Sequence, residues 1–162
     1  MIRPGLAAFV IAICAGCSNS SPTAPATEPP ADFQGQYSGT YRVTKCIDEG
    51  IFVGFCDGAG FTAGETLPIA LLLTQNQNAA SGSVMLGSVS GTFLGTVTGT
   101  TLSGTAVMND VSTEGITLST AITSWNTTIA GSALTGGFTV VFRTPATTGS
   151  ATLTNTIARL TR

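Results

Sequence analysis

The chain has 162 residues, of which 43% are hydrophobic and 9% charged, and its formal net charge is −2 at pH 7. This length allows one domain of ordinary size with some residues to spare. Six Lys and Arg against eight Asp and Glu leave no basic surface for a phosphate backbone, which argues against nucleic-acid binding. The absence of histidine removes the commonest general base and the commonest metal ligand. We therefore expect no enzyme of a familiar class, no metal site and no cofactor.

The N-terminus has the layout of a secretory signal peptide. An uncharged apolar run follows Arg3, and small residues then precede Cys17. The run is shorter than the ~20 apolar residues that a membrane-spanning helix needs. Residues 1–16 are therefore predicted to be a signal peptide.

Ala15-Gly16-Cys17 resembles the lipobox of bacterial lipoproteins, although Cys14 stands where that family usually has Leu. In the family the cysteine thiol receives a diacylglyceryl group, the peptide is cut before the cysteine, and the new amine is acylated. The resemblance implies lipidation at Cys17 and, with Ser18 next to it, an outer-membrane protein on either the periplasmic or the surface face. Several acyl chains hold a protein on a membrane stably. The alternative is a plain secretory peptide with an incidental cysteine.

Residues 17–31 contain no large apolar residue and four prolines, which exclude a helix or a central strand. This composition predicts a disordered Pro/Ser/Thr tether. The folded domain is then expected over residues 32–162.

From Gln36 onward, apolar residues alternate with Ser and Thr, which is typical of half-buried antiparallel strands. Thr suits the pleated backbone and keeps the outer face wet. No window after the signal peptide has helical apolar spacing. Turn signals then separate about eight predicted strands: Gln36–Cys46, Leu67–Gln75, Ala80–Leu86, Val89–Val97, Thr101–Met108, Ile116–Ile129, Ala133–Arg143 and Gly149–Leu160.

Consecutive hairpins predict an all-β, antiparallel up-and-down meander. Eight such strands can close into a barrel with no free edge. Phe93 lies between Gly91 and Gly95 on the inward face, and alternating large and small residues suits a strongly curved wall. The alternative to a closed barrel is an open β-sandwich.

The opening Gly35-Gln36-Tyr37, followed by another Gly-Thr-Tyr, resembles the first strand of calycin-type barrels, the lipocalin and avidin-like group. In those barrels a tryptophan two residues after the glycine plugs the closed end, and Tyr37 stands in its place. In lipocalins an arginine near the end of the last strand packs over that ring, a role that the resemblance gives to Arg159. The resemblance implies a ligand-binding barrel. The alternative is that Tyr37 is an ordinary core residue and Arg159 is solvated.

Cys46 and Cys56 are the two cysteines of the predicted domain. An exported protein meets an oxidising compartment, which predicts a disulfide between them. Closing a loop of this length would stabilise the fold by about 2–3 kcal/mol.

The same region carries an unusual set of acidic and aromatic residues. It is interpreted as a lid over the barrel mouth, as a partner-docking surface, or as a long loop whose phenylalanines cap the core. Its members are Asp48, Glu49, Asp57, Glu65, Phe52, Phe55 and Phe61.

Two functions follow from these patterns. The first is a lipid-anchored envelope protein whose barrel binds a hydrophobic or aromatic small molecule. The second is a structural or protein-interaction module of the envelope with a filled core. A pocket of about 300 Å³ or more would favour the first.

A lone tryptophan stacks on a ligand or, more often, packs at a rim, which is where we expect the chain's one tryptophan. The candidate ligand contacts are aromatic: Tyr37, Tyr41, Phe93, Trp125 and Phe138.

Overall fold

The computed structural model describes residues 29–113, 116–145 and 148–162. The predicted signal peptide, Cys17 and most of the predicted tether lie outside these residues. Among the residues described, no helix is long and apolar enough to cross a membrane. The elements are β1 (Gly35–Gly50), α1 (Phe55–Gly58), β2 (Thr66–Asn76), β3 (Ala79–Leu86), β4 (Val89–Thr98), β5 (Thr101–Met108), β6 (Val111–Thr113), β7 (Ile116–Ala130), β8 (Ala133–Arg143) and β9 (Gly149–Thr161).

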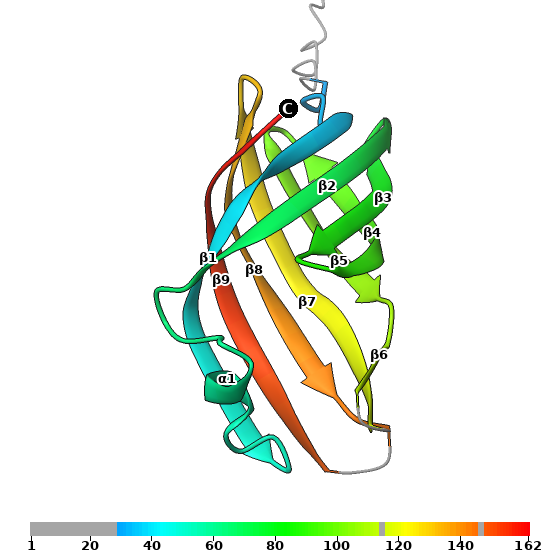
Figure 1. Cartoon of the computed structure of the whole chain (residues 1–162). Helices are drawn as coiled ribbons and strands as arrows, with labels where there is room; N and C mark the ends of the chain where they lie inside the picture. Colours follow the sequence, from blue (N-terminus) through cyan, green and yellow to red (C-terminus); the bar gives the residue numbers. More distant parts are fainter. Residues whose placement is uncertain (1–28, 114–115, 146–147) are drawn as a thin grey trace, which may run out of the picture.

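The strands form a closed antiparallel barrel (Figure 1). Each of β1 to β4 pairs with the strand that follows it, β7 pairs with β8 and β8 with β9. Pairing of β9 with β1 and of β5 with β7 completes the ring of eight strands. This confirms the predicted meander and barrel and rules out the open sandwich. The short β6 was not predicted; it pairs with β7 outside the ring.

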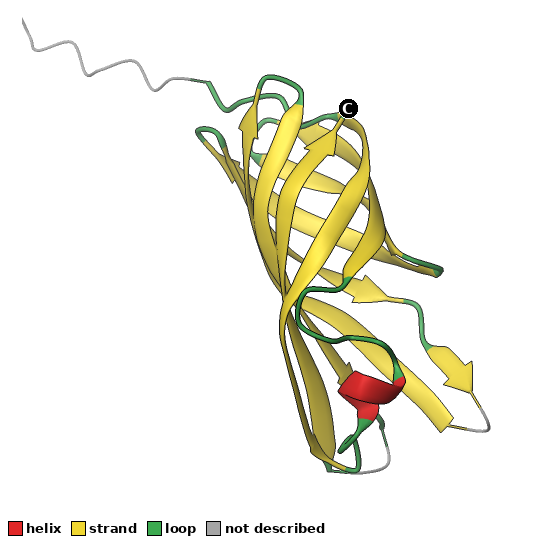
Figure 2. Cartoon of the chain, turned by 60° about the vertical axis from the view of Figure 1, so that its left-hand side comes forward, coloured by secondary structure: helices red, strands yellow, loops and turns green. Residues whose placement is uncertain are grey.

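The barrel has two unlike ends. The described N-terminal residues and the C-terminus meet at one end, which we call the terminal end (Figure 1). At the other end, the mouth, β1, β7, β8 and β9 extend beyond the other strands of the ring (Figure 1), and α1, red in Figure 2, lies beside them. The turn between β3 and β4, at Gly87 and Ser88, also belongs to the mouth because it follows Leu86, which pairs with Ile69 near the start of β2.

Three β-bulges change which side chains face the interior. The first bulge lies in β9. Thr40 of β1 stands opposite Arg159 of β9, whereas Arg42 of β1 stands opposite Thr156, so β9 has one residue more than β1 over this stretch. Ile157 and Leu160 are therefore both buried, and Arg159 between them is exposed. Similar register shifts lie in β1 and β7.

Aromatic side chains fill the middle of the barrel. We call Phe93, Trp125 and Phe138 the aromatic core. The Trp125 ring stacks on Phe138, with centroids 5.2 Å apart, and meets Phe93 edge to face at 5.5 Å. Its indole N–H donates a hydrogen bond of 2.9 Å to Thr127 Oγ1, which satisfies its polar atom. The expectation of a rim position for Trp125 was wrong: the bulge in β7 turns this residue inward, and it is 2% exposed.

Two facing glycines make room for the aromatic core. Gly95 of β4 stands opposite Gly104 of β5. A Cβ atom added to Gly95 would lie 2.8 Å from the ring of Phe93, and one added to Gly104 would lie 2.6 Å from it. The expected alternation of large and small inward residues is thus confirmed in this part of the wall.

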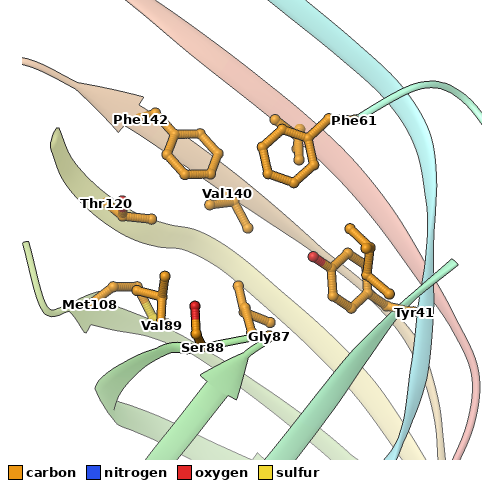
Figure 3. A pocket seen from close by; sticks show the side chains of 12 residues that line it. Tyr41, Phe61, Gly87, Ser88, Val89, Met108, Thr120, Val140 and Phe142 are labelled. Atoms are coloured by element: carbon orange, nitrogen blue, oxygen red, sulfur yellow. The ribbon is translucent and has the colours of Figure 1, made fainter. Parts of the chain in front are cut away.

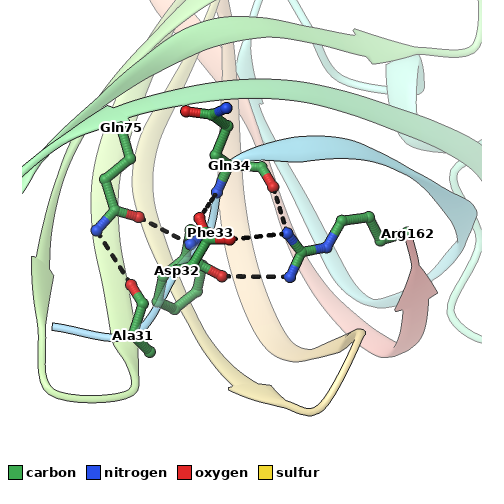
Figure 4. A network of polar contacts seen from close by, with 6 residues as sticks. All are labelled: Ala31, Asp32, Phe33, Gln34, Gln75 and Arg162. Atoms are coloured by element: carbon green, nitrogen blue, oxygen red, sulfur yellow. Dashed lines mark hydrogen bonds and ion pairs between the residues drawn. The ribbon is translucent and has the colours of Figure 1, made fainter.

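The terminal end is closed by Tyr37 and Phe33, both fully buried. Arg162 lies over the Tyr37 ring, 5.6 Å from its centroid, and pairs with Asp32 at 3.2 Å. Figure 4 shows the same guanidinium donating to the carbonyl of Gln34. The assignment of this role to Arg159 was wrong, because the bulge in β9 shifts the inward-facing position to Leu160 and then to Arg162.

The polypeptide before β1 is held by the side chain of Gln75. Its amide oxygen accepts a hydrogen bond from the backbone N–H of Phe33, and its amide nitrogen donates to the carbonyl of Ala31 (Figure 4). The N–H of Ala31 donates in turn to the carbonyl of Gly99, in the turn between β4 and β5. The chain is thus fixed across the terminal end from Ala31 onward.

Candidate functional site

An apolar cavity of about 240 Å³ lies at the mouth of the barrel (Figure 3). It begins where the aromatic core ends. The chain that lines it comes from strand ends, one hairpin turn and the long loop between β1 and β2. Its lining residues are Tyr41, Phe61, Leu67, Leu86, Gly87, Ser88, Val89, Met108, Thr120, Val140, Phe142 and Leu153.

The walls of the cavity follow from strand periodicity. Val140 on β8 and Leu153 on β9 are inward-facing residues that pair with one another across the two strands. Met108 ends β5 with its side chain inward. β5 ends here, whereas β7 and β8 continue past it, so the inner faces of the longer strands extend beyond the end of β5. The space between them is the cavity.

The loop between β1 and β2 covers one side of the cavity. The predicted disulfide between Cys46 and Cys56 is present and ties this loop to β1. The Asp48 carboxylate accepts a hydrogen bond of 3.1 Å from the backbone N–H of Cys56. Phe61 stacks on Phe142 of β8 with centroids 5.6 Å apart. The loop therefore places an aromatic cover over the mouth.

Phe55 of α1 joins this cover. Its ring lies 5.1 Å from that of Phe142 and 5.9 Å from that of Phe61. Phe52 packs against it from the other side at 5.4 Å and is 4% exposed. The loop phenylalanines thus form a cluster of their own at the mouth, apart from the aromatic core.

Tyr41 forms the boundary between the aromatic core and the cavity. Its ring meets Phe138 edge to face, and its hydroxyl oxygen points into the cavity (Figure 3). Among the described residues, no hydrogen bond to this hydroxyl is present, and its oxygen is not fully covered by neighbouring atoms. Burial raises the pKa of Tyr41 to about 12, because the tyrosinate would lose its hydration in this apolar setting. The group is therefore a neutral O–H at all physiological pH values.

Thr120 supplies another hydroxyl to the wall, on the opposite side from Tyr41, and Ser88 of the hairpin turn supplies a third (Figure 3). Its oxygen is covered by its neighbours and has no hydrogen-bond partner. All twelve lining residues are uncharged. In the part of the chain that the structure describes, no three His, Cys, Asp or Glu residues gather into a group that could hold a metal ion. The cavity offers apolar contact and a hydroxyl group.

The five aromatic residues proposed as ligand contacts occupy three different places. Tyr41 lines the cavity. Phe93, Trp125 and Phe138 form the aromatic core, and Tyr37 closes the terminal end.

Most of the cavity wall was not anticipated from the sequence. Phe142, Val140 and Leu153 show the alternation of an inward-facing strand, but alternation does not distinguish a filled interior from a cavity. Met108 and Thr120 carry no local signal of a cavity. Their place in it depends on where β5 ends relative to β7.

The loop also presents apolar groups to solvent. Ile51 is 58% exposed and Val53 is 76% exposed, at the tip that precedes α1. They flank the buried Phe52. The acidic residues Glu49, Asp57 and Glu65 are exposed as well.

Comparisons of the chain with protein-family models, with curated proteins and with solved structures give no match. The barrel geometry is consistent with a calycin-like fold.

Proposed function

We propose that this protein is a non-enzymatic protein of the cell envelope that holds a small apolar molecule in the cavity at the mouth of its barrel. The cavity is the observation that carries the proposal: most of the barrel is filled, and the remaining space is apolar and partly roofed. Eight-stranded barrels have interiors just wide enough to be filled by side chains or to hold one small ligand. This barrel combines a filled part with a hollow part.

The size of the cavity limits what it can hold. Its volume of about 240 Å³ is below the roughly 300 Å³ at which pockets for drug-sized ligands begin. An apolar cavity of about 150 Å³ is sufficient for benzene. The expected ligand therefore has one or two small rings, or a short branched chain.

The test is a titration of the purified full chain with p-xylene, followed by NMR of the side-chain methyl groups. Val89→Trp should fill the cavity, since Val89 lines it at the rim, and should weaken binding by tenfold or more. Leu94→Trp is the matched control, because Leu94 lies on the same strand but faces outward and is 62% exposed. Shifts in the wild-type protein should centre on Met108, Val140 and Leu153. No binding to the wild-type protein, or equal binding to both variants, would refute the proposal.

The second part of the proposal is a lipid anchor at Cys17. The described chain begins at the terminal end, so an anchor before it would connect to the barrel at the end opposite the cavity (Figure 1). Cys17→Ser should release the protein into the soluble fraction, whereas Cys14→Ser should leave it on the membrane. Membrane association that survives Cys17→Ser would contradict the anchor and leave the cavity proposal standing.

An interaction module is the second candidate function. It is supported by the exposed Ile51 and Val53 beside the disulfide-tied loop. In this case the wild-type protein binds no p-xylene. A photo-crosslinking residue at position 53 then captures an envelope protein that one at position 94 does not.

A further inference from the structure

Tyr41 places a hydroxyl group inside an otherwise apolar space. Its side chain is 4% exposed, and no hydrogen bond joins its hydroxyl to another described residue. The structure gives this hydroxyl no role in holding the fold together. The Tyr41 oxygen is not among the fully covered polar atoms that lack a partner, so it is open to water or to a molecule in the cavity.

We propose that the cavity selects a neutral, ring-sized molecule that carries a hydrogen-bond acceptor, such as a ketone, an aldehyde or an ether, and that the Tyr41 O–H donates to this acceptor. This inference rests on the proposed function, and it names the chemical class of the ligand.

The ligand is neutral because the cavity has nothing to balance a charge. Every lining residue is uncharged. A carboxylate or an ammonium group would lose its hydration on entry and gain no opposite charge in return, at a cost of several kcal/mol. This separates the expected ligand from fatty acids and other amphiphiles with an ionised head.

The ligand carries an acceptor because the available group is a donor. The raised pKa keeps Tyr41 protonated, and a phenolic O–H donates readily. Of the two other hydroxyls in the wall, that of Thr120 has its oxygen covered by neighbouring atoms, and that of Ser88 belongs to an exposed residue of the turn between β3 and β4. Tyr41 is therefore the buried residue of the wall whose hydroxyl a molecule in the cavity can reach.

The position of the Tyr41 hydroxyl oxygen is fixed by the packing of its ring. The Tyr41 ring is held edge to face against Phe138, with centroids 5.1 Å apart and planes inclined at 70°. Tyr41 also lies opposite Leu67 in the pairing of β1 with β2. Because the ring is held in place, binding costs little side-chain entropy, and no protein hydrogen bond has to break first.

The experiment uses three molecules of nearly the same shape. Acetophenone carries a carbonyl acceptor, α-methylstyrene replaces that oxygen with a methylidene group, and benzoate replaces the methyl with an anionic oxygen. Each is titrated by calorimetry at pH 7 against the wild-type full chain, Tyr41→Phe and Tyr37→Phe. Tyr37→Phe is the matched control, because it removes the hydroxyl of the chain's other tyrosine, which is buried at the opposite end of the barrel.

Tyr41→Phe should weaken acetophenone binding by about fivefold to tenfold, which is the worth of one net hydrogen bond. It should leave α-methylstyrene binding unchanged or slightly tighter. Tyr37→Phe should change neither, and benzoate should not bind measurably. The carbonyl stretch of bound acetophenone should move to lower frequency in the wild-type protein and return in Tyr41→Phe.

Each other outcome decides against one of the two proposals. If Tyr41→Phe changes the binding of acetophenone and α-methylstyrene equally, Tyr41 acts by packing and the inference is wrong. Benzoate binding as tightly as acetophenone would also overturn it. If none of the three molecules binds the wild-type protein and p-xylene does not bind either, the proposed function itself fails. Binding of p-xylene alone keeps the proposed function and refutes the hydrogen bond.

Discussion

Tyr41 meets Phe138 edge to face, with ring centroids 5.1 Å apart, and this contact divides the barrel interior in two. On the Phe138 side, the aromatic core fills the space with Trp125 and Phe93. On the Tyr41 side lies the cavity. The interior is therefore both a packed core and a binding space, separated by one pair of rings.

Phe138→Ala should remove this partition. Phe138 is 3% exposed, and deleting its ring should lower the free energy of unfolding by about 3–5 kcal/mol, measured by urea denaturation. The cavity should then extend toward Trp125 and take up naphthalene more tightly. Leu94→Ala, at an exposed site, should change stability by less than about 0.5 kcal/mol. A loss of under about 1 kcal/mol in Phe138→Ala would show that the partition is not part of the packed core.

Arg162→Ala should destabilise the terminal end. It removes the cation over the Tyr37 ring, the ion pair with Asp32 and the hydrogen bond to Gln34. The ion pair is largely exposed and adds little, so we expect a loss of about 0.5–2 kcal/mol, mainly from the stacked ring contact. Arg159→Ala is the control, since its side chain is exposed, and should be nearly neutral. Equal effects of the two substitutions would contradict the assignment of this contact to Arg162.

Removing the disulfide should loosen the cover over the cavity. The Cys46→Ala, Cys56→Ala double variant should lose about 2–3 kcal/mol of stability, because an open loop gains freedom in the unfolded chain. Phe61 should then cover the cavity less tightly, so p-xylene should dissociate faster, which NMR line-shape analysis measures. Reductant should reproduce both effects in the wild-type protein and have none on the double variant. Ligand dissociation that is the same with and without the disulfide would mean that the loop is no cover.

Stability should fall at alkaline pH because of Tyr41. Its pKa is raised from 10.0 to about 12 in the folded protein, so its contribution is fully present below pH 10 and is lost as the pH rises toward 12. The loss should reach about 2–3 kcal/mol, measured by urea denaturation between pH 8 and pH 12. Burial also raises the pKa of Tyr37, which adds a drop of the same sign.

Tyr41→Phe should remove part of the alkaline loss, and the Tyr41→Phe, Tyr37→Phe double variant should remove more. Absorbance of tyrosinate should appear in the wild-type protein only as it unfolds. If both tyrosines ionise near pH 10 in the folded protein, the hydroxyls are open to water and the account of the cavity is wrong.

The strands of this protein are readable from its sequence. Alternation of apolar residues with Thr and Ser, broken by glycine at the turns, placed eight strands close to their observed bounds. The disulfide followed from the two cysteines of a domain that the sequence predicts to be exported. The inward position of Phe93 between glycines was also visible, because a bulky ring in a tight wall needs small neighbours. These features are local, so the local sequence encodes them.

The bulges were not readable, and they decided which side chains meet. A bulge adds one residue to one strand and reverses the alternation after it. In β9 this reversal exposed Arg159 and brought Arg162 over Tyr37; in β7 it turned Trp125 into the core. Nothing in either strand alone marks the extra residue, since a bulge is defined by the register between two strands.

What the amino-acid sequence by itself determined is the period of the strands, the turns between them and the presence of a tied loop. What only the tertiary structure decided is the choice of a closed ring over an open sandwich, through the pairing of β1 with β9, together with the filled part of the interior and the cavity beside it. The physical reason is that the cavity depends on a difference in strand length: β5 ends at Met108, whereas β7 and β8 continue past it. A difference between strands that are distant along the chain becomes visible only when they lie side by side.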